Sequence, residues 1–165
     1  MLKILQKSIL FLIISYNCYS QITDLSVFAS HNIDSNIVMI NHHNFLIYYD
    51  TTNQIPKYAI HILYNTERKK SLKKGGFRYD RQINKRYQRG KEYYKRLNKN
   101  GHIYDKGHIV PYADMSINII IAKETMVYTN CVPQYYKLNR NGWRKIEDHF
   151  RKFIEDRSGF LIVIR

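Results

Sequence analysis

Cysteine, proline and glycine are all scarce in this chain of 165 residues, with two, three and seven copies respectively. Two cysteines exclude a disulfide framework and any zinc site built from four cysteines. So few prolines and glycines exclude collagen-like and low-complexity chains. The hydrophobic fraction of 44% instead allows one domain with a buried core.

Acidic residues are also in short supply, with 13 against 27 lysines and arginines, which gives a net charge of +14. A charge this high favours polyanions as partners. Residues 67–100 hold fourteen of the basic residues, only three acidic ones, and the aromatic residues Phe77, Tyr79, Tyr87, Tyr93 and Tyr94. We interpret this region as a phosphate-binding surface, because a merely soluble surface would mix both signs. The alternative is a solvated loop with a short helix near Arg89–Leu97.

The first twenty residues have the layout of a secretory signal peptide. Lys3 and Lys7 precede the apolar run Ile9–Ile14, and Cys18 and Ser20 stand at the −3 and −1 positions of a cleavage site. The run is too short to span a membrane, which needs about 20 apolar residues. We expect a secreted or periplasmic protein with no stable membrane association after cleavage. The alternative is a buried first helix or strand.

The remaining chain alternates short strands with few helices. Its β-branched and aromatic residues predict strands over 37–40, 45–49, 58–64 and 160–164. The segment Gly142–Ile154 predicts an amphipathic helix with a core-facing side formed by Trp143, Ile146, Phe150, Phe153 and Ile154. We expect an α+β domain over residues 45–165, a leader over 21–44 and the signal peptide over 1–20.

The residues suited to chemistry begin with Asp105–His108, which read DKGH. His108 is the natural general base, because a neutral imidazole accepts a proton from water at physiological pH. Gly107 is expected to let the backbone turn sharply just before it. The other histidines have no comparable neighbours, and we interpret them as surface or packing residues.

Oxygen donors follow downstream. Asn130 and Asn139 supply amide oxygens, and Glu147 supplies a carboxylate. Such hard donors with little charge suit Mg²⁺, whereas zinc prefers thiolate and imidazole. Together with a general base and a basic surface, these oxygen donors supply the groups that phosphodiester hydrolysis requires. Alternatives remain: Asn130 could cap a turn, Asn139 could belong to a helix N-cap, and Glu147 with Arg151 could be an i,i+4 surface pair.

Four ordered blocks resemble the DNA/RNA non-specific endonuclease family, a branch of the His-Me finger (ββα-metal) nucleases. They read FLIYYDTTNQIPKYAIHILY, DKGHIVPYADM, TNCVPQ and LNRNGWRKIE. The resemblance covers residues 45–154 and implies a ββα-metal core on a mostly antiparallel sheet. Members normally continue past the helix with further strands and another helix. The domain is therefore expected to be truncated at its C-terminus, leaving the strand over 160–164 without its partner.

The resemblance implies a role for the matched residues. His108 corresponds to the general base that activates the attacking water. Asn139 corresponds to the direct ligand of a single Mg²⁺ (or Mn²⁺), and Glu147 to the acidic residue that holds the water shell of the metal. Arg151 corresponds to a basic residue that contacts the phosphate.

Other positions are matched less completely. Asn130 corresponds to an asparagine that supports the histidine, and Asp105 is expected to orient the motif loop. Lys106 stands where much of the family has arginine, so it keeps the charge but loses the planar fork, and its contact with the transition state is expected to be weaker. The family also has an arginine upstream, for which Arg78 and Lys74 are equally good candidates.

These inferences predict an exported, Mg²⁺-dependent endonuclease with little sequence preference. The resemblance implies that it cleaves both DNA and RNA and leaves 5′-phosphate ends. The alternative is a catalytically decayed nucleic-acid-binding protein of the same fold. Lys106 and the short domain would be signs of that decay. Action on anionic membranes is the weakest hypothesis, because Gly75 and Gly76 interrupt the basic region where an amphipathic helix would be needed.

Overall fold

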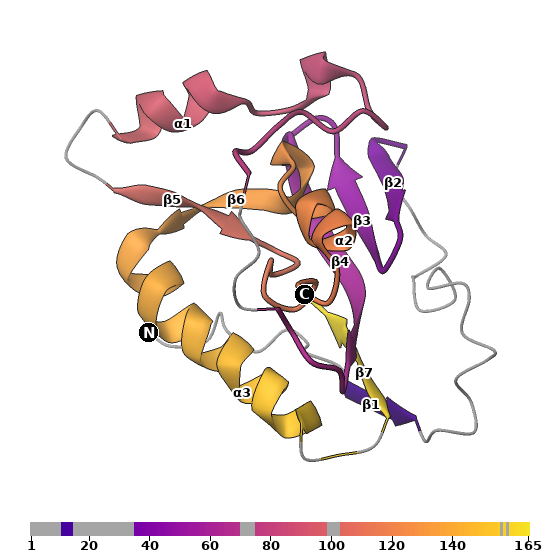
Figure 1. The fold of residues 1–165 in the computed structure, drawn as a ribbon. Helices are drawn as coiled ribbons and strands as arrows, with labels where there is room; N and C mark the ends of the chain where they lie inside the picture. The colour runs from indigo at the N-terminus through magenta and orange to yellow at the C-terminus, as the bar shows by residue number, and fades with distance from the viewer. Residues whose placement is uncertain (1–10, 15–34, 70–74, 99–102, 156, 158) are drawn as a thin grey trace, which may run out of the picture.

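Strands dominate the computed structural model, which describes residues 11–14, 35–69, 75–98, 103–155, 157 and 159–165. Within these ranges a five-stranded sheet with the order β1-β7-β4-β3-β2 lies beside a separate two-stranded pair, β5-β6 (Figure 1). All neighbouring strands are antiparallel. The strands are β1 Phe11–Ile14, β2 Ile37–His42, β3 Phe45–Asp50, β4 Ile55–Tyr64, β5 Tyr104–His108, β6 Cys131–Tyr135 and β7 Phe160–Ile164.

The helices are short except for the last one. The described residues contain α1 Lys91–Leu97, α2 Ile119–Glu124 and α3 Arg144–Glu155, with 3-10 turns η3 Lys85–Tyr87 and η5 Tyr128–Asn130 and a π-helical turn η6 Leu138–Trp143. The β5-β6 pair lies between α1 and α3 (Figure 1). The expected α+β class with a mostly antiparallel sheet is therefore confirmed. No helix in the described ranges has the length and apolar character needed to cross a membrane.

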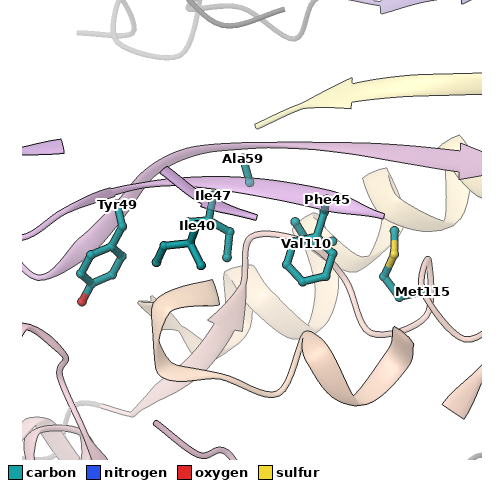
Figure 2. Close-up of a cluster of buried hydrophobic side chains, with 7 residues drawn as sticks. All are labelled: Ile40, Phe45, Ile47, Tyr49, Ala59, Val110 and Met115. Atoms are coloured by element: carbon teal, nitrogen blue, oxygen red, sulfur yellow. The ribbon is translucent and has the colours of Figure 1, made fainter. Parts of the chain in front are cut away.

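The large sheet buries side chains on both of its faces, because alternate residues of a strand point to opposite sides. On one face Leu46, Tyr48 and Ile60 pack with residues of β7. On the other face lies the cluster drawn in Figure 2, formed by Ile40, Phe45, Ile47, Tyr49, Ala59, Val110 and Met115. Val110 and Met115 belong to the segment that follows His108. The sheet therefore supports the segment that carries the predicted general base.

Helix α3 packs on the sheet through its C-terminal half. Phe150 and Ile154 are buried against residues of β4 and β7, as predicted. Ile146, in contrast, is 41% exposed, so the prediction that it faces the core is wrong. The reason is that the buried residues of β4 and β7 meet α3 at Phe150 and Ile154, and Ile146 is not part of that cluster.

Strand β7 differs from the sequence-based expectation. It pairs with β4 on one side and with β1 on the other, so it is not the unpartnered strand that we expected. The partner is the apolar run Phe11–Ile14, which lies within the expected signal peptide. Strand β2 lies within the expected leader and pairs along all six of its residues with β3.

Candidate active site

The predicted functional residues come together where the β5-β6 pair meets α3. β5 and β6 pair from Tyr104↔Tyr135 to His108↔Cys131, and the turn η6 and helix α3 follow directly after β6. A pocket of about 390 Å³ opens between these elements. Its lining includes four of the predicted site residues, His108, Asn139, Glu147 and Arg151. Lys106 and Asn130 do not line it.

His108 is the last residue of β5, and its imidazole rests against apolar groups. The ring centroid lies 4.9 Å from that of Phe77. Nε2 lies 3.4 Å from the sulfur of Met126. These neighbours contact the imidazole at the wall of the pocket. Phe77 and Met126 were not identified as site residues, because only the fold brings them next to the histidine.

Asn130 holds the segment that follows His108. Its side chain is fully buried, and its Oδ1 accepts a hydrogen bond from the Val110 amide at 2.9 Å. Its Nδ2 donates to the carbonyls of Val110 and Thr125 at 2.9 and 3.0 Å. The backbone carbonyl of Asn130 also accepts from the Ile109 amide at 3.0 Å. These contacts fit a supporting role, with the amide turned to the backbone and away from the pocket.

Gly107 lies inside β5, so the expectation of a sharp turn before His108 is wrong. The strand pairs regularly there, with Gly107 opposite Val132. Glycine is needed for another reason: a Cβ at this position would lie 2.7 Å from the Cβ of Gln134. A side chain at position 107 would therefore push β5 and β6 apart next to His108.

Asn139 is oriented by Asp105. Its Nδ2 donates to Asp105 Oδ2 at 3.0 Å, and Arg140 binds the same carboxylate through Nε at 2.9 Å and Nη2 at 2.7 Å. The hydrogen bonds from Arg140 lower the pKa of Asp105, which keeps it ionised. An ionised carboxylate only accepts hydrogen bonds, so the NH₂ group of Asn139 must face it. The amide oxygen is left as the group of Asn139 that can bind a cation.

Glu147 supplies the carboxylate of the pocket. Arg165 Nη1 donates to its Oε1 at 3.0 Å. Burial raises the pKa of Glu147, and the charge of Arg165 opposes that shift. The i,i+4 pair with Arg151 that the sequence left open is not the arrangement found here. Instead, Arg151 binds Asp114 and Asp148.

The donors of the pocket suit a hydrated metal ion. Within the described residues no group of three or more His, Cys, Asp or Glu side chains is placed to hold a metal. The pocket is lined by the amide of Asn139 and by two carboxylates, Glu147, which accepts a hydrogen bond from Arg165, and Asp148, which accepts one from Arg151. Mg²⁺ is commonly bound in this way, through one or two protein groups and several waters. The residues present therefore fit such an ion.

A buried ionic network behind the pocket was not identified from the sequence. Asp114 has a fully buried side chain, accepts a hydrogen bond from His61 Nε2 at 3.0 Å, and is paired with Arg151. Arg165 Nη2 lies 3.7 Å from the same carboxylate. Burial alone would raise the pKa of Asp114, but the hydrogen bond from His61 and the nearby cations lower it overall. The sequence does contain one sign of this network, because His61 is a polar residue within the apolar segment that forms β4.

His61 predicts a pH dependence of stability. Burial lowers the pKa of His61 below its ordinary value of 6.5 and outweighs the opposing effect of Asp114. Below pH 6.5 the unfolded chain therefore binds a proton that the folded chain does not, so stability falls as the pH falls. We expect urea unfolding to show a slope of up to about 1.4 kcal/mol per pH unit from this group.

The variant His61→Gln tests this assignment. Glutamine can still donate a hydrogen bond to Asp114 but does not titrate, so we expect a flatter pH dependence below pH 6.5. An unchanged slope in His61→Gln would contradict the assignment.

Two other basic candidates lie outside the pocket. The Nζ of Lys106 lies 5.6 Å from the ring centroid of Phe77 and 5.4 Å from that of Tyr94. Arg78 donates from Nη1 to the carbonyl of Lys123 at 2.7 Å. Lys74 lies outside the described residues.

The basic region holds several of its cations over tyrosine rings. Lys85 lies 4.5 Å from the ring centroid of Tyr79, and Arg89 lies 4.5 Å from that of Tyr93. The expected short helix is present as α1. Lysines and arginines held in this way are suited to binding phosphate groups.

This arrangement defines a ββα-metal nuclease core. The antiparallel pair β5-β6, the turn η6 with Asn139 and the helix α3 surround one pocket. A solved structure of EndoG in complex with EndoGI has this fold, with a TM-score of 0.64 and 22% identity. That match covers 78% of this chain and 51% of the EndoG chain. The protein belongs to the DNA/RNA non-specific endonuclease family, whose model matches residues 24–165.

A curated relative is also named as a nuclease. A protein called "Nuclease" from Nostoc sp. is 37% identical over 60 residues, which cover 36% of this chain and 22% of the relative. The matched part of this chain therefore spans about half of the EndoG chain and less than a quarter of the Nostoc protein.

Proposed function

We propose that this protein is an endonuclease that hydrolyses phosphodiester bonds of DNA and RNA with little sequence preference and needs Mg²⁺ (or Mn²⁺). One observation carries the proposal: His108 and Asn139, which are 31 positions apart in the sequence, line the same pocket. Glu147 lines it as well. Membership of a generally metal-dependent nuclease family supports the same conclusion.

The residues of the pocket divide the chemistry between them. His108 accepts a proton from the attacking water, and Phe77 holds its ring in place. Asn139 would bind the metal through its amide oxygen, and Glu147 would hold the water shell. A bound ion would neutralise the negative charge that develops on the phosphate and on the leaving oxygen.

Arg151 and Lys106 would add positive charge near the substrate. Arg151 lines the pocket, and Asp114 fixes the direction of its guanidinium. Lys106 lies at the aromatic groups beside β5 and is the more distant of the two. DNA and RNA are the substrates that the net charge of +14 favours.

Incubation of the purified protein with supercoiled plasmid and with total RNA tests this proposal. We expect both substrates to be degraded in Mg²⁺ or Mn²⁺ and to stay intact in EDTA, because a divalent ion at Asn139 would neutralise the charge that develops on the phosphate and on the leaving oxygen. Salt-dependent binding without cleavage in either metal would contradict the proposal. That result would favour the non-catalytic nucleic-acid-binding protein.

We further propose export to the periplasm or to the outside of the cell, on the basis of the signal-peptide layout of residues 1–20. Fractionation of producing cells and the mass of the mature protein test this proposal. A mature chain that begins at Gln21 is the expected result. A mature chain that retains residues 11–14, which form β1, would contradict it.

A further inference from the structure

Three arginines line the pocket, and they differ in their bonding. Arg140 is held by both oxygens of Asp105. Arg151 is held by Asp114 and Asp148, and its side chain is only 12% exposed. The side chain of Arg144 is exposed, and within the described part of the structure its guanidinium makes no hydrogen bond or ion pair, although its backbone amide donates to the carbonyls of Asn139 and Asn141.

The carboxylates near Arg144 are occupied by other cations. Glu147 and Asp148 lie three and four positions further along α3, the spacing at which helical side chains are neighbours. Glu147 is bound by Arg165, and Asp148 is bound by Arg151. The guanidinium of Arg144 therefore keeps its planar set of donors available at the mouth of the pocket.

We infer that Arg144 binds a phosphate group of the nucleic acid that flanks the bond to be cleaved. This inference rests on the proposed function, which assigns the scissile phosphate to the part of the pocket at His108 and Asn139. Arg144 begins α3 directly after the turn η6 that carries Asn139. A nucleic-acid strand with its scissile phosphate at Asn139 would bring a neighbouring phosphate group to Arg144. A guanidinium group is well suited to bind phosphate.

The inference sets an expectation about the substrate. A ligand that spans both His108 and Arg144 must carry more than one phosphate group, so oligonucleotides should be preferred to a single diester. Contacts to phosphates carry no sequence information, which agrees with little sequence preference. The contact should strengthen binding without taking part in the chemical step.

The test compares Arg144→Ala with Lys145→Ala. The two residues are neighbours on α3, both are exposed and both are cationic, but Lys145 does not line the pocket. Binding of a fluorescent 12-nucleotide single strand is measured in EDTA over a series of salt concentrations. We expect Arg144→Ala to weaken binding about 10-fold and to reduce the slope of log K against log salt by about 0.7. Lys145→Ala should bind within about twofold of the wild type.

Cleavage of the same 12-mer in Mg²⁺ gives a second measurement. Arg144→Ala should raise KM and leave kcat unchanged, because the contact is the same in the bound state and in the transition state. Equal binding losses in both variants would overturn the inference, as would a loss confined to kcat. If the wild type cleaves nothing, the proposed function fails, and the binding comparison in EDTA still decides whether Arg144 contacts phosphate.

Discussion

Replacing His108 by alanine is expected to lower the cleavage rate by about 10²–10⁴-fold. The variant keeps the pocket and the oxygen donors of Asn139 and Glu147 but has no group to accept the proton of the attacking water. Binding of nucleic acid should stay close to that of the wild type, since the basic surface is unchanged. Initial rates of plasmid relaxation in Mg²⁺ and binding in EDTA measure the two effects separately.

A matched control is available in the same protein. His149 is an exposed histidine on α3 outside the pocket lining, and His149→Ala should cleave at the rate of the wild type. Circular dichroism should show that both variants are folded. Equal activity of His108→Ala and the wild type would refute the assignment of the general base.

Replacing Asp114 by alanine is expected to reduce the free energy of unfolding by about 3–5 kcal/mol, because a buried ionic network that loses one partner keeps uncompensated charge. Asp114 faces His61, Arg151 and Arg165, and its own side chain is fully buried. Activity should fall as well, since Arg151 lines the pocket and Arg165 binds Glu147. Urea unfolding at neutral pH measures the loss of stability.

Asp148 provides the comparison for this prediction. It binds the same guanidinium of Arg151 at 2.6 Å, but its side chain is 53% exposed. Exposed pairs contribute about 0.2–1 kcal/mol, so Asp148→Ala should unfold almost as the wild type does. Similar losses in the two variants would show that burial is not what makes Asp114 important.

The candidate catalytic residues could be predicted from the sequence. The blocks around His108, Asn139 and Glu147 are local patterns, and each combines residue types that the chemistry of phosphodiester hydrolysis requires. The strands β2, β3 and β4 could also be predicted, because β-branched and aromatic residues cluster within a few positions of one another. Their pairing into one sheet agrees with the expected mostly antiparallel fold.

Other features depend on contacts between distant parts of the chain. The requirement for glycine at position 107 comes from Gln134 on the neighbouring strand. The two-sided pairing of β7 comes from the apolar run at residues 11–14. The exposure of Ile146 depends on which residues of α3 the strands β4 and β7 contact. Hydrophobic periodicity describes one element at a time and contains no information about such neighbours.

By itself, the sequence determined which chemical groups the protein has, the positive charge that favours polyanions, and the local elements that carry the predicted site. Only the tertiary structure decided which charged groups pair with one another. It joined Asp114 to His61 and Arg151, gave Glu147 its bond to Arg165, and left Arg144 available at the mouth of the pocket. The physical reason is that the strength of an ionic or hydrogen-bonding contact depends on distance and burial, which are properties of the folded chain.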